Sequence, residues 1–385
     1  MVDTGRTPSL QQVVAALEER YDPATAEDWD RVGLVCGDPE AAVRRVVFAV
    51  DPVDSVVSEA LDWGAQLLVT HHPLLLRGVH SVAADTSKGR RVHRLIAGGC
   101  GLLAMHTNAD SADPGVNDAL ADLLGLTDVV PLRPIPDQVW DKWTVHVPAQ
   151  DREALAEAFF AAGAGASGPY SRAAYWQSAR GQYQPERGAR SGAGGVGQIE
   201  LVTSDRLELV APRSLRGPLT SVLRRQHPYE EPAYDVVEMI AEPGRRGIGR
   251  LGQLRQPINV RSFAERVEQI LPATAHGVRV AGGLERQVRS VALCGGAGDS
   301  LLSDVRRLGA DVYLTADLRH HPVEEHLSEG GCPLVDVAHW ASEWPWLEGA
   351  ASTLVSDLAV AGLTVETRVS TRPTDPWSLH LGEPA

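Results

Sequence analysis

Residues 66–73 read QLLVTHHP, a short apolar run that ends directly at two histidines, His71 and His72. A short apolar run bounded by a turn signal is typical of a buried strand, so we expect a strand over Gln66–Thr70. The same arrangement returns where an apolar run at 101–105 leads to His106. A helix is predicted before each of these strands, and alternating strands and helices predict a parallel sheet covered on both faces.

The alternation of strands and helices fills both ends of the chain. Further strands are expected at Val43–Val50, Val288–Cys294, Asp311–Thr315, Leu334–Ala338 and Thr364–Val369. Helices are expected from Thr7-Pro8-Ser9 through about Tyr21, and at Val53–Trp63, Arg90–Ala97 and Ser342–Val360. We therefore predict one discontinuous α/β domain with parallel-rich sheets, built from residues 1–133 and 244–385.

The middle of the chain, residues 134–243, has a different order of elements. It reads strand, helix, a Gly-rich segment, strand, helix, strand, which favours an inserted α+β domain of the ferredoxin-like (PII/CutA-like) kind. Gly181–Gly197 is rich in Gly, Arg and Ser and is expected to be a mobile loop.

Composition restricts the class of protein. The chain has 50 acidic and 36 basic residues, a net charge of -14, which argues against a nucleic-acid binder or a protein that docks on an anionic membrane. The beginning of the chain lacks the basic and apolar regions of a signal peptide, and no apolar stretch is long enough to span a bilayer. The expected location is the cytoplasm.

Histidines and carboxylates gather where the predicted strands end. The histidines are His71, His72, His106, His320, His321 and His339, and the carboxylates are Asp110, Asp317 and Glu343. In open α/β sheets ligands bind at the carboxyl edge of the strands, so separate loops can converge on one site. Mixed imidazole and carboxylate ligands suit Zn, Fe, Mn or Ni rather than Ca or Mg.

The spacing of these residues favours two ions rather than one. Adjacent side chains such as those of His71 and His72 diverge on an extended backbone, so each can serve a different ion. His339 and Glu343 are four residues apart at a predicted helix start and share one helical face. A carboxylate in that position can bridge two metals, and a metal pair can activate water.

Other features have an ordinary structural interpretation. A single histidine after a strand is usually a capping or surface residue, and His80, His93, His146, His276 and His380 are interpreted in that way. Gly295–Ser300 can present backbone amides to a phosphate. It lacks the Lys-Ser/Thr ending of a P-loop, however, so a tight turn is favoured.

Several motifs, in order along nearly the whole chain, resemble those of one family. They are Ala26–Leu34 (AEDWDRVGL), Thr70–Pro73 (THHP), His106–Asp110 (HTNAD), His227–Pro232 (HPYEEP), Thr315–His321 (TADLRHH) and Asp336–Glu343 (DVAHWASE). In combination they resemble the NGG1-interacting-factor-3-like family, also called GTP cyclohydrolase 1 type 2 homologs. Arg31, Ala316 and Ala338 depart from the family pattern, which has Asn at the first position and Gly at the other two.

The resemblance implies a different role for each group of candidate residues. His72 and Asp110 would bind one divalent ion, His71 and His339 the other, and Glu343 would bridge the two. His106 and His321 would line the site and transfer protons, and Asp317 would support a ligand or transfer a proton. The resemblance also implies a toroidal homohexamer.

The function that this resemblance favours is a metal-dependent hydrolase that acts on a nucleotide-like or phosphorylated small molecule. A GTP cyclohydrolase that opens the guanine ring is a narrower version of the same hypothesis. The alternative is a protein without catalytic activity, either a metal-storage protein or metallochaperone, or a regulatory scaffold ring. An exchangeable coordination position would favour the enzyme, because structural sites are closed by protein ligands.

Overall fold

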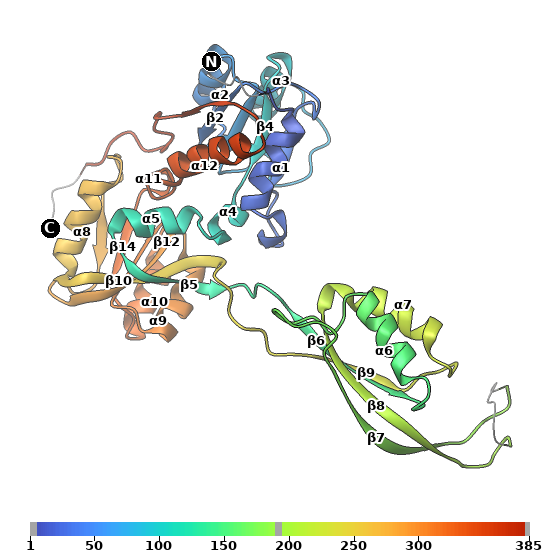
Figure 1. Ribbon diagram of the computed structural model, residues 1–385. Coiled ribbons are helices and arrows are strands. Elements are labelled where there is room, and N and C mark those ends of the chain that lie inside the picture. The colour runs from blue at the N-terminus through green and yellow to red at the C-terminus, as the bar shows by residue number, and fades with distance from the viewer. Residues whose placement is uncertain (1–5, 189–194, 382–385) are drawn as a thin grey trace. The chain divides into compact units, whose positions relative to one another are not determined.

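A computed structural model describes residues 6–188 and 195–381 of the chain. It divides into two compact units, one made of Met1–Ile135 and Arg245–Ala385 and the other of Pro136–Gly244 (Figure 1). The first unit is thus assembled from both ends of the chain, and the second lies between them in sequence.

The first unit contains two sheets, each parallel at its centre. One has the order β1 (Gly33–Cys36), β4 (Gly101–Ala104), β3 (Leu67–Thr70), β2 (Arg45–Ala49), β15 (Glu366–Val369). Only the β1–β4 pair is antiparallel. The other has the order β11 (Arg279–Ala281), β14 (Leu334–Val337), β13 (Val312–Ala316), β12 (Gln287–Ala297), β10 (Gly247–Asn259), β5 (Thr127–Pro134). Its β12–β13 and β13–β14 pairs are parallel.

Helices cover these sheets. They are α1 (Leu10–Arg20), α2 (Asp54–Asp62), α3 (Ser87–Ala97), α4 (Thr107–Ser111), α5 (Val116–Leu124), α8 (Val260–Ile270), α9 (Leu302–Leu308), α10 (His320–Ser328), α11 (His339–Glu343) and α12 (Trp346–Val360), with short 3₁₀ turns at Pro23–Thr25 and Asp299–Leu301. None of the helices in the described ranges is long and apolar enough to cross a membrane.

Alternating side chains along the strands give each sheet two apolar faces. In β12, Val291 and Leu293 join the large core shared with α5 and α8, whereas Ala292 and Cys294 face α9 on the other side. A strand presents successive side chains to opposite faces, so an uninterrupted apolar run fits a sheet that is buried on both. This explains why the sequence predicted these central strands correctly.

In its described residues, the second unit is a four-stranded antiparallel sheet with two helices. Its elements follow the order β6 (Trp140–Val147), α6 (Arg152–Ala161), β7 (Ala174–Tyr183), β8 (Glu200–Pro212), α7 (Arg216–Gln226), β9 (Tyr234–Glu238), with a 3₁₀ turn at Arg213–Leu215. The strands lie in the order β7-β8-β6-β9. This is the split βαβ arrangement of ferredoxin-like domains.

Three sequence predictions were wrong in detail. The helix expected over Ser342–Val360 starts earlier and is broken at Pro345, because proline cannot donate the hydrogen bond that a continuous helix requires. The helix expected from Thr7-Pro8-Ser9 begins at Leu10, with Ser9 as its N-cap. The Gly-rich segment begins inside β7, which extends to Tyr183, and residues 189–194 of that segment lie outside the described residues.

A buried ion pair joins the two chain halves of the first unit. Arg250 on β10 is 1% exposed and donates from Nε and Nη2 to the two carboxylate oxygens of Asp118 on α5, at 2.7 and 2.6 Å. Its Nη1 also donates to the backbone oxygen of Gly249 at 2.8 Å. Removal of one partner from such a pair leaves a buried charge without compensation, which is costly.

We predict that Arg250→Met lowers the free energy of unfolding of the first unit by about 3–5 kcal/mol. The matched control is Arg133→Met, since Arg133 pairs with Asp304 through a side chain that is 48% exposed. That change is expected to cost less than about 1 kcal/mol. Urea denaturation measures both values, and equal losses would contradict the role given to the buried pair.

Candidate metal centre

The predicted ligands lie at the carboxyl ends of strands from both sheets of the first unit. His71 and His72 follow β3, and His106 follows β4 and precedes α4, which carries Asp110. His339 and Glu343 occupy the two ends of α11, directly after β14. The prediction that the loops converge at one sheet edge is therefore corrected, because two sheets contribute.

Four imidazoles share one orientation. Each Nδ1 donates to an oxygen outside the cluster: His71 to Met105 O at 2.9 Å, His72 to Asp51 at 2.7 Å, His106 to Asp30 at 2.9 Å and His339 to Asp317 at 2.7 Å. A proton held on Nδ1 leaves the Nε2 lone pair available. Metal-binding histidines are oriented by this kind of outer hydrogen bond.

The Nε2 atoms point toward one another and toward Glu343. His72 Nε2 lies 3.1 Å from His339 Nε2, and His339 Nε2 lies 3.0 Å from Glu343 Oε1. His71 Nε2 is 3.3 Å from the same oxygen, and His72 Nε2 is 3.2 Å from Glu343 Oε2. Two groups, His71-His72-His106 and His72-His339-Glu343, each bring their ligand atoms within 4.8 Å of one another.

The donor set fits a metal ion. His71 Nε2 and Asp110 Oδ1 are buried without a hydrogen bond, 3.7 Å apart, and Glu343 Oε2 approaches His72 without forming one. An unpaired buried polar atom costs about 1–3 kcal/mol. A cation between these atoms would satisfy all of them.

The charges of the site favour positive charge at its centre. Burial alone would lower the pKa of His72, but the charges of Glu343 and Asp51 outweigh burial and raise this pKa to about 10. Burial opposes the charge of His339 in the same way, yet Glu343 and Asp317 raise its pKa to about 11. Burial would raise the pKa of Glu343, and the neighbouring imidazoles instead hold it well below its usual value.

The structure brings together seven of the eight predicted residues. His106 faces the cluster, with ring centroids 5.2 and 5.5 Å from those of His71 and His72, so it is a candidate ligand as well as a lining residue. His321 is exposed on α10, and the contact described for its ring is with His320 at 5.1 Å. The division of the ligands between two ions stays a prediction, and the distances associate Asp110 with His71.

Sequence reasoning missed two of the carboxylates that orient the imidazoles, Asp51 and Asp30. Asp51 directly follows the predicted strand 43–50, and Asp30 lies within the AEDWDRVGL motif, so both carried a signal. His276 was interpreted as an ordinary histidine, yet it lines the mouth of the site. Nothing in its local sequence marks it, because it is brought there by the turn before β11.

A cavity of about 240 Å³ opens onto His72 and His339. Its lining includes Trp340 and residues 374–377 near the end of the described chain. Thr374 donates a hydrogen bond to Asp51, which in turn orients His72. Among the described residues, the lining of this cavity includes three carboxylates, Asp51, Asp317 and Asp375, and no lysine or arginine.

Comparison with known proteins identifies the family. The family model described as Duf34/NIF3 (NGG1p interacting factor 3) matches residues 8–376. The chain belongs to this family. The resemblance inferred from the motifs is thereby confirmed over nearly the whole sequence.

Relatives and solved structures agree with this assignment. Proteins named GTP cyclohydrolase 1 type 2 homolog are 48% identical in Mycobacterium tuberculosis (96% of this chain, 97% of the relative) and 33% identical in Bacillus subtilis (96% and 98%). A NIF3-related Bacillus cereus protein has a TM-score of 0.70 at 32% identity (97% and 100% covered). Staphylococcus aureus SA1388 has a TM-score of 0.79 at 25% identity (97% and 99%).

We predict that Glu343→Gln abolishes most metal binding, because the change removes the charge that faces three imidazoles. The loss should exceed the roughly 10- to 100-fold reduction in affinity typical of removing an outer hydrogen-bond partner. Glu348→Gln is the matched control, since this residue is exposed on the next helix. Metal per chain is measured by mass spectrometry on protein prepared without chelator or His tag, and equal metal content in the two variants would contradict the site.

Proposed function

We propose that the chain holds two divalent metal ions in this cluster and is a metal-dependent hydrolase. The observation that supports the proposal is the convergence of three inward Nε2 atoms, those of His71, His72 and His339, on one buried carboxylate, Glu343, whose two oxygens face different histidines. A carboxylate with this placement suits a bridge between two ions. Zn, Fe, Mn and Ni are the metals that such ligands suit.

Carboxylates around the cluster would hold the imidazoles in the orientation that binds metal. When bound, a metal pair polarises a substrate oxygen and lowers the pKa of water. Asp30, Asp51 and Asp317 keep three imidazoles in the tautomer that binds metal. The opening of the cavity at His72 and His339 leaves this side of the cluster accessible to a small molecule, which supports an enzyme over a closed structural site.

The residues that line the cavity at His72 and His339 restrict the orientation in which a nucleotide-like or phosphorylated substrate can bind. Asp51, Asp317 and Asp375 repel a phosphate, and the described lining offers no cationic side chain to hold one. A phosphate or carbonyl oxygen would therefore face the metals, whereas hydrogen-bond donors of the substrate would face the carboxylates. The name of the relatives suggests GTP as one member of this substrate class.

We predict that protein loaded with Mn, Fe or Zn hydrolyses at least one of p-nitrophenyl phosphate, bis(p-nitrophenyl) phosphate and GTP. Turnover is followed by absorbance and chromatography. Glu343→Gln should reduce it to background, and Glu348→Gln should leave it unchanged. Activity that persists in metal-free protein would contradict the proposed chemistry.

The same experiment separates the alternative of metal storage, metallochaperone activity or a regulatory scaffold. A protein that binds about two ions and transfers them to a chelating acceptor, with no turnover of any probe, would favour storage or delivery of metal. Absence of metal above the Glu343→Gln background after reconstitution would favour the scaffold.

The family assignment also supports a proposal about assembly. We infer a toroidal homohexamer, as the resemblance implies. Size-exclusion chromatography with light scattering should then give six times the chain mass of 41.3 kDa. A monomer or dimer at micromolar concentration would contradict this proposal without affecting the metal site.

A further inference from the structure

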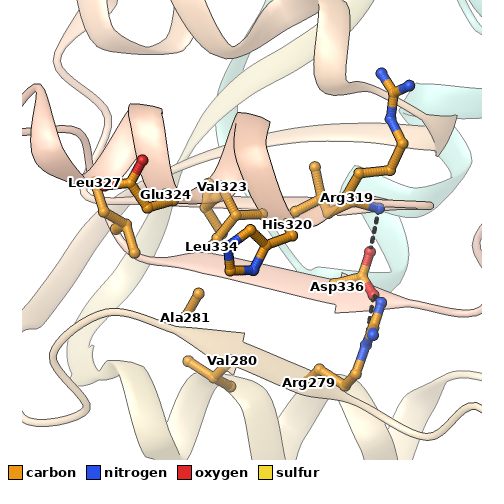
Figure 2. A pocket seen from close by; sticks show the side chains of 11 residues that line it. Arg279, Val280, Ala281, Arg319, His320, Val323, Glu324, Leu327, Leu334 and Asp336 are labelled. Atoms are coloured by element: carbon orange, nitrogen blue, oxygen red, sulfur yellow. Dashed lines mark hydrogen bonds and ion pairs between the residues drawn. The ribbon is translucent and has the colours of Figure 1, made fainter.

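A second cavity lies beside the metal centre and shares no ligand with it. Its volume is about 490 Å³, within the range of small-molecule sites. Figure 2 shows it between α10 above and β11 below, with β14 behind. Both its position and its size distinguish it from the cavity that opens onto His72 and His339.

The walls of this cavity follow from helix and strand periodicity. His320, Val323, Glu324 and Leu327 are spaced i, i+3, i+4 and i+7 on α10, so they share one helical face. That face supplies one wall. Val323 and Leu327 are only half-buried, so this apolar stripe is not fully covered by the chain itself.

The opposite wall is the edge of the six-stranded sheet. Strand pairing places Arg279 opposite Asp336 and Ala281 opposite Leu334, so these four side chains lie on one face. The small side chain of Ala281 leaves space where a larger residue would reach the helix. The result is a mainly apolar cavity with its charged groups at one end.

At the charged end of the cavity, both oxygens of Asp336 already accept hydrogen bonds, whereas Arg279 has N–H groups that can still donate. Asp336 Oδ1 accepts from Leu318 N at 2.9 Å, and Oδ2 lies 2.9 Å from both Arg279 Nε and His276 Nε2. Arg279 directs Nε and Nη2 to this one carboxylate and keeps other N–H groups unused. Its side chain is 56% exposed, so a ligand can reach it.

Neighbouring charges agree with an anionic ligand at this end. α10 begins here at His320 without a side-chain cap, and the start of a helix favours negative charge. Glu324, farther along α10, accepts a hydrogen bond from Ser328 Oγ at 2.7 Å. Arg319 points away from the cavity in Figure 2 and pairs with Asp299, so Arg279 is the guanidinium that faces the ligand.

We propose that this cavity binds a small amphipathic anion, with an apolar body between α10 and β11 and a carboxylate or phosphate head at Arg279. The apolar body contacts Ala281, Val323, Leu327 and Leu334. A cationic head would meet Arg279 and the start of α10, and a wholly polar ligand would leave the apolar walls exposed to water. The site does not depend on the proposed hydrolase activity.

Isothermal titration of the full chain tests the site with three probes: octanoate, octyl phosphate and 1-octanol. Octanoate or octyl phosphate should bind saturably at one site per chain, and the stronger of the two identifies the head group. The neutral alcohol should bind about tenfold more weakly, because it lacks the charge-assisted hydrogen bond.

Two variants locate the ligand. Ala281→Phe fills the cavity and should abolish binding of all three probes, whereas Ala361→Phe changes an exposed residue at the end of α12 and should have no effect. Arg279→Met should weaken the binding of the two anions to the level of the alcohol. Arg261→Met should leave their binding unchanged, because Arg261 is exposed and pairs only at 3.9 Å with Glu285. Thermal unfolding checks that each variant is folded.

Hydrogen–deuterium exchange of the unmodified protein gives a test that does not need the variants. Bound octanoate should protect 279–281 and 318–327. Protection confined to the exposed apolar residues of Pro136–Gly244, or no saturable binding at millimolar probe, would overturn the proposal. So would a change in oligomeric size in Ala281→Phe with no probe bound by the unmodified chain, because the cavity would then be an interface between copies.

Discussion

The candidate metal centre depends on one buried carboxylate held among imidazoles. Glu343 is 2% exposed, and its oxygens lie within 3.3 Å of the Nε2 atoms of His71, His72 and His339. Burial of this charge is tolerated only with positive charge beside it. The imidazoles of the cluster supply that positive charge when protonated, or would bind a cation that supplies it. An oxygen outside the cluster accepts from each Nδ1 and fixes the orientation of the ring.

The arrangement of the chain explains how distant segments reach Glu343. β3 and β4 deliver their histidines from the first half of the sequence, and α11 delivers His339 and Glu343 from the second. The Arg250–Asp118 pair and the large shared core join these halves. An insertion at residues 136–244 is compatible with this site because every candidate ligand lies in the other unit.

The sequence predicted those elements and side-chain positions that local residue patterns determine. It did not predict those that depend on tertiary contacts. Apolar runs such as 67–70 predicted the central strands, and the i,i+4 spacing of His339 and Glu343 predicted their shared helical face. β10 was not predicted, since its glycines and arginines interrupt the apolar pattern while its backbone still pairs with two neighbours. His321 was assigned to the site from its motif, yet α10 places it on the surface.

Asp336 shows why a cluster cannot be understood from its ligands alone. Its Oδ1 accepts from Leu318 N, next to Asp317, whose φ of 57° is unfavourable for a residue other than glycine. Asp317 in turn holds His339 Nδ1. Asp336 therefore stabilises a strained backbone that orients a candidate metal ligand, and the same carboxylate lies at the charged end of the second cavity. Asp336 thus contacts Arg279, which lines the second cavity, and His276, which lines the cavity at His72 and His339.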